Sequence, residues 1–418
     1  DSNTLAFSTI FSKRMEVVDH KESVYPAITN RQGEAELFVG QVLNRQYRGA
    51  LYSNAVTRGT DFTVQNWTNT GETLTVNVQR ETTFYYDDFD KLQSHFSDQK
   101  EYASDSMHVL QQFIDGDVLG EAANAGSQVD AADVSGGTDA YGFTLSTSNL
   151  ISVLSLAELR LGIRSISPGL RRVAVVSPHF LNIVRQYLAG KDTPLADELL
   201  RNGRVLRALG WDFHLSNNIY WTGVLSLVTI PSDNDTLTFQ IWDIYAGATT
   251  ITIRFNDATL VANDVHIAST VDITRANTAT YLNTYAARVA DVTEATDAGV
   301  GAMTAANAHR MDGIGATNDN TADTLSLTWQ GIGFCNAGET LTDPTDTWTS
   351  GREIQHNLFL VPGAIDLVIQ YSPKVNVAPV PLRDGVYVKA STLWGLLSPR
   401  DGVRRMVDVA VDSSAFSF

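Results

Sequence analysis

Residues 171–216 read RRVAVVSPHFLNIVRQYLAGKDTPLADELLRNGRVLRALGWDFHLS, a stretch that alternates strand and helix patterns. The apolar run Arg171–Val176 is typical of a short buried strand. Ser177 and Pro178 then predict a helix start, because serine accepts free N–H groups of the first turn and proline at the first helical position loses no hydrogen bond. A second strand is expected over Trp211–Ser216. The stretch therefore predicts an α/β unit.

Two helical patterns precede this unit. Asp98 and Glu101 have the spacing of a capping box, in which the first residue caps the helix N-terminus and the acid three positions later bonds back to it. Apolar residues then recur every three or four positions and predict a long helix over about 98–120; they are Ala103, Met107, Leu110, Ile114 and Val118. The same spacing predicts a second helix over about 147–161, with one face formed by Leu150, Val153, Leu154, Ala157 and Leu161.

The segment 41–86 has a strand-like texture. Thr73–Val78 alternates apolar and polar side chains, and turn residues stand just before it. Its expected partner is Thr60–Trp67, which gives a long polar hairpin. Because an isolated hairpin buries too little surface to be stable, we expect it to pack on a neighbouring element or on another subunit.

Charge and texture change after the α/β unit. Residues 224–350 hold four arginines, no lysine and fifteen acids, a net charge of −11 out of −17 for the chain. Thr249–Arg254 alternates, turn residues are frequent, and helical texture is limited to about 276–290. The α/β pattern resumes with Leu358–Ile369. We therefore expect a β-rich acidic insert that leaves the core and returns to it.

The composition excludes several classes of protein. A chain of 418 residues with 43% hydrophobic residues can build a large core and two or three domains. The single cysteine, Cys335, excludes a disulfide framework or a thiolate zinc cluster, and we interpret it as a buried thiol. With a net charge of −17, the chain has no overall excess of basic residues, which tight sequence-independent binding to nucleic acid requires. No apolar run approaches the roughly 18 residues of a membrane helix, and no charged-then-apolar leader follows Asp1, so neither a membrane span nor a signal peptide is expected.

Candidate chemistry is sparse. The acids Asp87, Asp88 and Asp90 could act as paired carboxylates or bind a cation. Acids that precede a helix are more often solvent-exposed residues at its entrance, where the helix dipole favours negative charge, and we prefer that interpretation. Residues 233–235 (DND) and 318–320 (NDN) resemble fragments of calcium loops without the downstream glycine and glutamate, so turns are favoured. The eight histidines have no metal-ligand spacing. We predict no catalytic, cofactor-binding or metal-ligating residue, and no enzyme activity.

The order of elements is an arm, a polar hairpin, a long helix, an α/β core, a β-rich insert and a return to the core. Short motifs accompany that order: Val175-Val176-Ser177-Pro178, Asn202-Gly203-Arg204-Val205, Gly210-Trp211-Asp212-Phe213, Ala364-Ile365-Asp366-Leu367, Gln370-Tyr371-Ser372-Pro373, Leu393-Trp394-Gly395, Ser398-Pro399 and Gly402-Val403. Order and motifs together resemble the major capsid proteins of tailed bacteriophages, over roughly 40–220 and 356–412.

The resemblance implies an α+β fold of the HK97 type with an inserted all-β domain. The implied parts are an N-terminal arm (1–40), an extended β-hairpin loop (41–86), a peripheral domain with a spine helix (87–171), an axial domain (172–222), the inserted β-rich acidic domain (223–354) and a return to the axial and peripheral domains (355–418).

The resemblance also implies a structural function. Copies of the chain would assemble into hexamers and pentamers of an icosahedral shell around double-stranded DNA, with scaffolding, portal and decoration proteins as partners. The location would be the virion, after assembly in the host cytoplasm and without a membrane. No lysine falls clearly at the hairpin tip, so no Lys–Asn crosslink is inferred. Two other interpretations stay open: an encapsulin-like compartment shell, and a secreted β-rich carbohydrate-binding or hydrolytic protein that works through 224–354.

Overall fold

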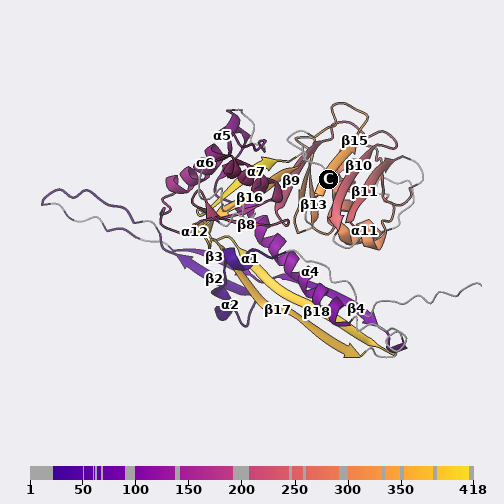
Figure 1. Cartoon of the computed structure of the whole chain (residues 1–418), viewed down its shortest axis with the longest axis horizontal. Coiled ribbons are helices and arrows are strands. Elements are labelled where there is room, and N and C mark those ends of the chain that lie inside the picture. The colour runs from indigo at the N-terminus through magenta and orange to yellow at the C-terminus, as the bar shows by residue number, and fades with distance from the viewer. Residues whose placement is uncertain are drawn as a thin grey trace, which may run out of the picture.

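The structure is a computed structural model, and it describes residues 22–49, 51–59, 61, 64–66, 69–89, 99–136, 142–191, 207–243, 247–257, 260–290, 300–331, 335–348, 353–379 and 384–413. An α/β body and a β-rich lobe lie side by side, and a long narrow sheet extends away from them (Figure 1). The fold is mixed α+β, as the sequence predicts.

One sheet runs through both the body and the lobe. Among the described residues it has nine strands, in the order β13-β14-β9-β16-β6-β8-β7, with β19 paired to β16 and β5 paired to β19. Strands β6 and β8 are parallel, which confirms the predicted α/β unit. The bounds are β5 (Gln128–Val129), β6 (Val173–Val176), β7 (Arg207–Ala208), β8 (Trp211–Leu215), β9 (Tyr220–Ser226), β13 (Ile314–Asp319), β14 (Thr324–Trp329), β16 (Ile354–Leu360) and β19 (Met406–Asp412).

The helices of the body cover this sheet. They are α5 (Ala131–Ser135), α6 (Leu150–Ile163) and α7 (Pro178–Ala189). Ser177 Oγ accepts the Phe180 N–H at 3.1 Å, so the predicted cap begins α7. The five apolar residues predicted to share one face of α6 are all buried. In the core, the ring of Phe359 lies 5.7 Å from that of Phe180 and 4.9 Å from that of Trp211.

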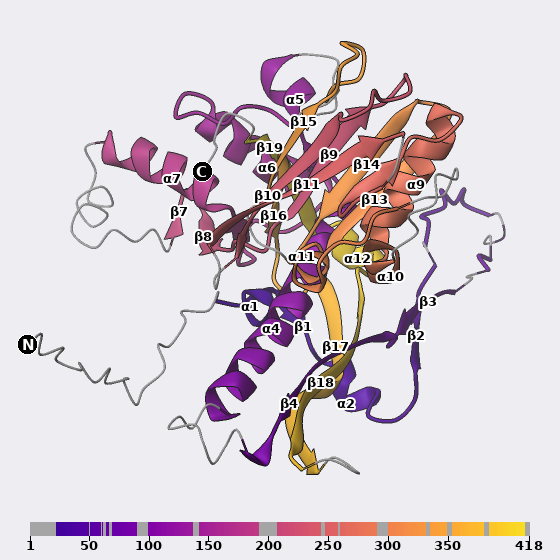
Figure 2. The same ribbon diagram turned by 90° about the vertical axis from the view of Figure 1, so that its right-hand side faces the viewer.

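The long narrow sheet is formed by strands from both ends of the chain. Its order is β1-β17-β18-β4, with bounds β1 (Thr29–Asn30), β4 (Val78–Tyr86), β17 (Ile365–Pro379) and β18 (Val386–Leu397). Helix α4 (Gln99–Gly120) lies along it, which confirms the long helix predicted over 98–120 (Figures 1 and 2). Ile114 and Val118 are buried there in one cluster with Trp394.

Short helices surround the start of this sheet. They are α1 (Tyr25–Ile28), α2 (Gly33–Glu36), η1 (Glu121–Asn124) and α12 (Arg400–Val403). Val24, Tyr25 and Ile28 are buried in the same cluster as α4. Residues 24–28 therefore pack in the body, whereas the resemblance implies an arm over the whole of 1–40.

The hairpin differs from the prediction in its pairing. Strand β3 (Thr70–Thr75) pairs with β2 (Val42–Tyr47), with Val42 opposite Thr75, and not with 60–67. Parts of 60–67 lie outside the described residues, and 64–66 form no strand. The pairing with β2 is supported by packing, because Leu43 of β2 joins Leu74 and Val76 in a small core with Leu37 and Val368 of the body.

The β-rich lobe has a core of its own. A second sheet, in the order β12-β11-β10-β15, faces strands β9, β13 and β14. Trp221, Phe239 and Trp329 are buried between the two sheets. The bounds are β10 (Thr236–Asp243), β11 (Gly247–Asn256), β12 (Asp264–His266) and β15 (Cys335–Thr340).

The lobe is β-rich but not all-β. It also contains α9 (Val271–Asn283), α10 (Tyr285–Val289) and α11 (Ala305–Arg310). The prediction of helical texture only over 276–290 misses the start of α9, because its buried face is partly hydroxylic: Thr274 and Thr278 are buried and donate to carbonyls four residues earlier. The lobe also shares β9 with the body sheet, since β9 pairs with both β14 and β16.

Candidate assembly surface

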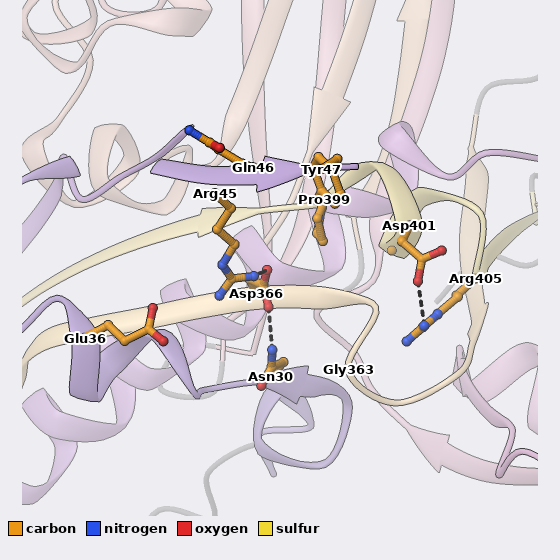
Figure 3. Close-up of a pocket in the computed structure, with 11 residues that line it drawn as sticks. Asn30, Glu36, Arg45, Gln46, Tyr47, Gly363, Asp366, Pro399, Asp401 and Arg405 are labelled. Atoms are coloured by element: carbon orange, nitrogen blue, oxygen red, sulfur yellow. Dashed lines mark hydrogen bonds and ion pairs between the residues drawn. The ribbon is translucent and has the colours of Figure 1, made fainter. Parts of the chain in front are cut away.

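The β2–β3 hairpin leaves the body at a polar groove of about 470 Å³. Arg45 in β2 forms an ion pair with Asp366 of β17, and Asn30 Nδ2 of β1 donates to the same carboxylate at 2.7 Å. Figure 3 shows the three side chains converging from these three strands. Asp366 is 2% exposed, so the contact fixes the position of β2 on the long sheet.

A second polar contact holds β3. Tyr47 donates its hydroxyl to Glu72 Oε2 at 2.5 Å, and Glu72 Oε1 accepts the Arg400 N–H at 2.9 Å. Burial and the Glu72 carboxylate raise the pKa of Tyr47 to about 12, so the phenol remains a donor at neutral pH. Asp401 and Arg405 pair at 2.5 Å on the adjoining wall. Polar contacts therefore set the direction of the hairpin.

The chain between β2 and β3 extends far from the body (Figures 1 and 2). Its two limbs are tied together, because Gln65 accepts the Tyr52 N–H at 3.0 Å and donates to the Tyr52 carbonyl. Leu51, Tyr52 and Val64 are 75%, 73% and 86% exposed, and no described residue covers them. A contiguous exposed apolar segment of this kind marks an interaction surface. We call 51–66 the extended loop.

Two acids with organised contacts lie in the last turns of α4, Asp115 fully buried and Asp117 partly buried. Asp115 accepts the N–H groups of Val24 and Tyr25, both at 2.8 Å, and Asn218 Nδ2 at 3.1 Å. Burial raises the pKa of Asp115 above its ordinary value. The carboxylate thus ties α1 and the segment before β9 to the long helix.

The neighbouring acid, Asp117, is where the lobe meets α4. Its carboxylate accepts Trp394 Nε1 of β18 and Gln330 Nε2 of the lobe, both at 3.1 Å. Burial raises the pKa of Asp117 to about 6. A Cβ on Gly116 would stand 2.7 Å from Gly331 Cα, so the lobe approaches α4 as closely as two backbones can.

None of these residues is among the candidates taken from the sequence. The available signal for Asp115 and Asp117 was that both acids stand inside the apolar stripe of a predicted helix. The contact that holds the base of the hairpin gave no such signal in the sequence, because its residues Asn30, Arg45 and Asp366 come from distant segments.

Acidic residues singled out in the sequence as candidates for chemistry form local hydrogen bonds with the backbone. Asp87 Oδ1 accepts the Phe89 N–H at 2.8 Å, as expected for a helix entrance, and Asp90 lies outside the described residues. Asp235 accepts the Ser232 N–H at 2.8 Å and Asp319 accepts the Thr321 N–H at 2.8 Å, which confirms both as turns. The thiol prediction for Cys335 falls outside the described side chains.

Both ring nitrogens of His356 have a polar neighbour. Its Nδ1 lies 2.6 Å from Asp408 Oδ2, and its Nε2 lies 2.8 Å from Thr222 Oγ1. The side chains of His356 and Asp408 are only 10% and 6% exposed. An imidazole this covered cannot reach a substrate, and the chain of contacts joins β9, β16 and β19. This supports the interpretation of a satisfied core histidine.

Metal clusters and membrane-spanning helices are absent from the described residues. In those residues, no group of three or more histidine, cysteine, aspartate or glutamate side chains has the geometry to hold a metal ion. No described helix is long and apolar enough to cross a membrane.

Comparison with known proteins identifies the fold. No protein-family profile and no curated protein sequence matches the chain. A chain of Mycobacterium phage Che8 is 13% identical with a TM-score of 0.56, over 100% of both chains. The capsid structure of cyanophage P-SCSP1u gives 11% identity and a TM-score of 0.53, over 97% of this chain and 94% of the other. The capsid asymmetric unit of cyanophage Pam1 gives 9% and 0.52, over 100% and 99%. The fold is therefore that of phage capsid chains, which confirms the HK97-type fold expected from the sequence.

Proposed function

We propose that this chain, which has the phage capsid fold along its whole length, is the major capsid protein of a tailed bacteriophage or a related tailed virus. Copies assemble into hexamers and pentamers of an icosahedral shell that encloses double-stranded DNA. The observation that carries the proposal is the extended loop, which presents exposed apolar side chains on a projection that the body does not cover.

The extended loop needs a second surface to bury its side chains. Leu51, Tyr52 and Val64 together expose apolar area that favours association by about 25 cal/mol per Å² buried. The base of the hairpin is already anchored through Leu74 and Val76, and no described residue covers the loop, so the proposal places its partner outside the chain. In a shell made of one protein, that partner is the next copy.

The role is structural and not enzymatic. The Asp115 carboxylate and the His356 imidazole both contact residues of other helices or strands, and so hold the fold together. The net charge of −17 keeps the wall from binding DNA phosphates tightly, so that packing and release are not hindered. Scaffolding, portal and decoration proteins would complete assembly in the host cytoplasm, and the mature location is the virion. An intersubunit arm is proposed only for residues 1–21, because Tyr25 and Ile28 are packed in the body.

The test removes the extended loop and leaves the hairpin. Replacing 50–66 by a short Gly/Ser linker, or changing Leu51, Tyr52 and Val56 together to serine, should leave near-native circular dichroism. We expect neither variant to form closed particles in electron micrographs. Asn54→Ser, an exposed polar change in the same loop, is the matched control and should assemble normally.

Two results would contradict the proposal. One is wild-type protein that stays monomeric at all concentrations, and the other is normal particles from both loop variants. Nuclease-resistant DNA inside native particles separates a viral capsid from a compartment shell, which would hold protein cargo instead.

A further inference from the structure

Helix α6 buries one apolar face and leaves three more apolar side chains exposed on the other side, with the exposed Ser152 and Ser155 between them. Its inner face packs in the body core through the five residues predicted from the sequence. On the other side, Ile151, Leu159 and Ile163 are 38%, 54% and 68% exposed. At 100° per residue, positions 151, 159 and 163 fall within about 120° of one another, on a stripe about 18 Å long. We call these three residues the α6 stripe.

Arginines gather at the C-terminal end of the α6 stripe. Arg160 pairs with Asp133, and Arg404 donates to the Arg164 carbonyl at 2.8 Å. No acid among the described residues lies within ion-pair distance of Arg164. Burial, and then the neighbouring Arg160 and Arg404, lower the pKa of Arg164. The Arg164 guanidinium lies over Gly126, beside the end of the α6 stripe, and leaves there a positive charge that an external carboxylate would stabilise.

The lobe carries a surface on which exposed apolar side chains lie beside negative charge. Val228 and Ile230 are 45% and 46% exposed, just after β9. Beside them, Asp272 and Asp323 both pair with the single guanidinium of Arg275, which is fully buried. The Arg275 guanidinium also donates to the Leu227 carbonyl, which places this acidic pair next to Val228. Two half-exposed carboxylates share one cation, so the patch stays negative. We call Val228, Ile230, Asp272 and Asp323 the lobe patch.

Charge and position make the two surfaces complementary between copies. Residues 142–191 hold six basic residues and one acid, a charge of +5, whereas 224–350 carry −11. In Figure 1, helix α6 lies on the far side of α7 from strands β10, β11 and β13 of the lobe. The two surfaces can therefore meet between two copies of the chain that stand head to tail.

We propose that the α6 stripe and Arg164 of one copy bind the lobe patch of a second copy of this chain. A contact between two different surfaces repeats from copy to copy and closes into a ring when the rotation allows, which is what a capsomer needs. DNA is the less suitable partner, because the phosphate backbone gives Ile151, Leu159 and Ile163 nothing to pack on. This inference rests on the proposed function and names one of its interfaces.

The test is a charge exchange across the contact. Arg164→Glu and Asp272→Arg should each lower the fraction of protein in capsomers by at least about tenfold, measured by analytical ultracentrifugation. The double variant, which exchanges the charges, should recover most of that fraction. Lys191→Glu is the matched control: it makes the same charge change at an exposed position of the same segment and should assemble like wild type.

A covalent test reports the geometry independently of charge. In the double variant Leu159→Cys with Ile230→Cys, a short bismaleimide should join neighbouring copies in assembled capsomers into a ladder of covalent oligomers. Each single variant should give no such ladder.

The outcomes separate this inference from the proposed function. If wild type forms particles but Arg164→Glu assembles equally well, the α6 contact is wrong and the capsid proposal stands. Normal assembly with less packaged DNA in Arg164→Glu would assign the arginines to nucleic acid and overturn the inference. If wild type forms no particles, the proposed function fails.

Discussion

At the residue scale, one turn of α4 determines how the lobe sits on the long helix. Gly116 lets the backbone of Gly331 approach, and Asp117 receives hydrogen bonds from both Gln330 and Trp394. A cation–π contact between Arg80 and Phe113, 3.9 Å from guanidinium to ring centroid, lies on the same helix one turn earlier. Backbone proximity and a partly buried carboxylate thus act together at one place.

The steric part is tested by Gly116→Ala. Its Cβ would meet backbone atoms of Gly331 at 2.7 and 2.8 Å, which neither side can avoid by rotating a side chain. We expect the free energy of unfolding in urea to fall by about 1–3 kcal/mol. Gly162→Ala, in α6 with open space around it, should instead gain up to about 1 kcal/mol from helix propensity. A similar effect of the two changes would contradict the contact.

The electrostatic part is tested by pH. The pKa of Asp117 is about 6 in the folded chain and 3.8 without the fold, so the folded state holds a proton that the unfolded state has already lost. The free energy of unfolding should therefore fall as pH rises from about 4 to about 6, by up to about 3 kcal/mol for this group. Asp117→Asn should lack that component. Urea unfolding of both proteins from pH 4 to pH 7 measures it, and a pH-independent difference between them would show that Asp117 titrates normally.

At the scale of elements, patterns that repeat along the chain were predictable and contacts between distant strands were not. The stripe of α4 and the inner face of α6 follow from helix periodicity; the inner face of α6 is buried throughout, and the α4 stripe is buried at Leu110, Ile114 and Val118. The hairpin was paired wrongly, because alternation marks a strand without marking its partner, and 42–47 lies across a long loop from β3. The contact of Asp366 with Asn30 and Arg45 joins residues more than 300 positions apart, which no local pattern predicts.

The packing of α4 gives the prediction at this scale. Leu110 is 1% exposed on the face of the helix that lies against the long sheet. Leu110→Asp would bury an unpaired charge, at a cost of several kcal/mol, so we expect insoluble protein. Ser104→Asp, an exposed position of the same helix, should give wild-type yields of soluble protein. Soluble Leu110→Asp at wild-type yield would mean that this face is not packed.

At the scale of the whole molecule, the body and the lobe have separate cores joined through one sheet. All residues of the lobe core come from a single span, Trp221 to Ala337, with Leu341 and Trp348 packed against it. Strand β9 is nevertheless shared, since Tyr220, Trp221 and Thr222 pair with β16 of the body. The sequence located the lobe through its charge and β texture, but the texture changes gradually across β9 and could not place the boundary within a strand.

The shared strand decides where an independent fragment must begin. Trp221 is 2% exposed, and its ring stacks on that of Trp329 at 6.2 Å between centroids and 19° between planes. A fragment of residues 220–348 keeps all of β9, so it should be soluble, monomeric and cooperatively folded, with β-type circular dichroism. A fragment of 223–354 lacks Trp221 and should lose about 3–5 kcal/mol, as when a buried tryptophan is truncated. Urea unfolding of the two fragments compares them directly. Equal stabilities would show that the lobe core does not depend on β9, and an unfolded 220–348 would show that the lobe cannot fold without the body.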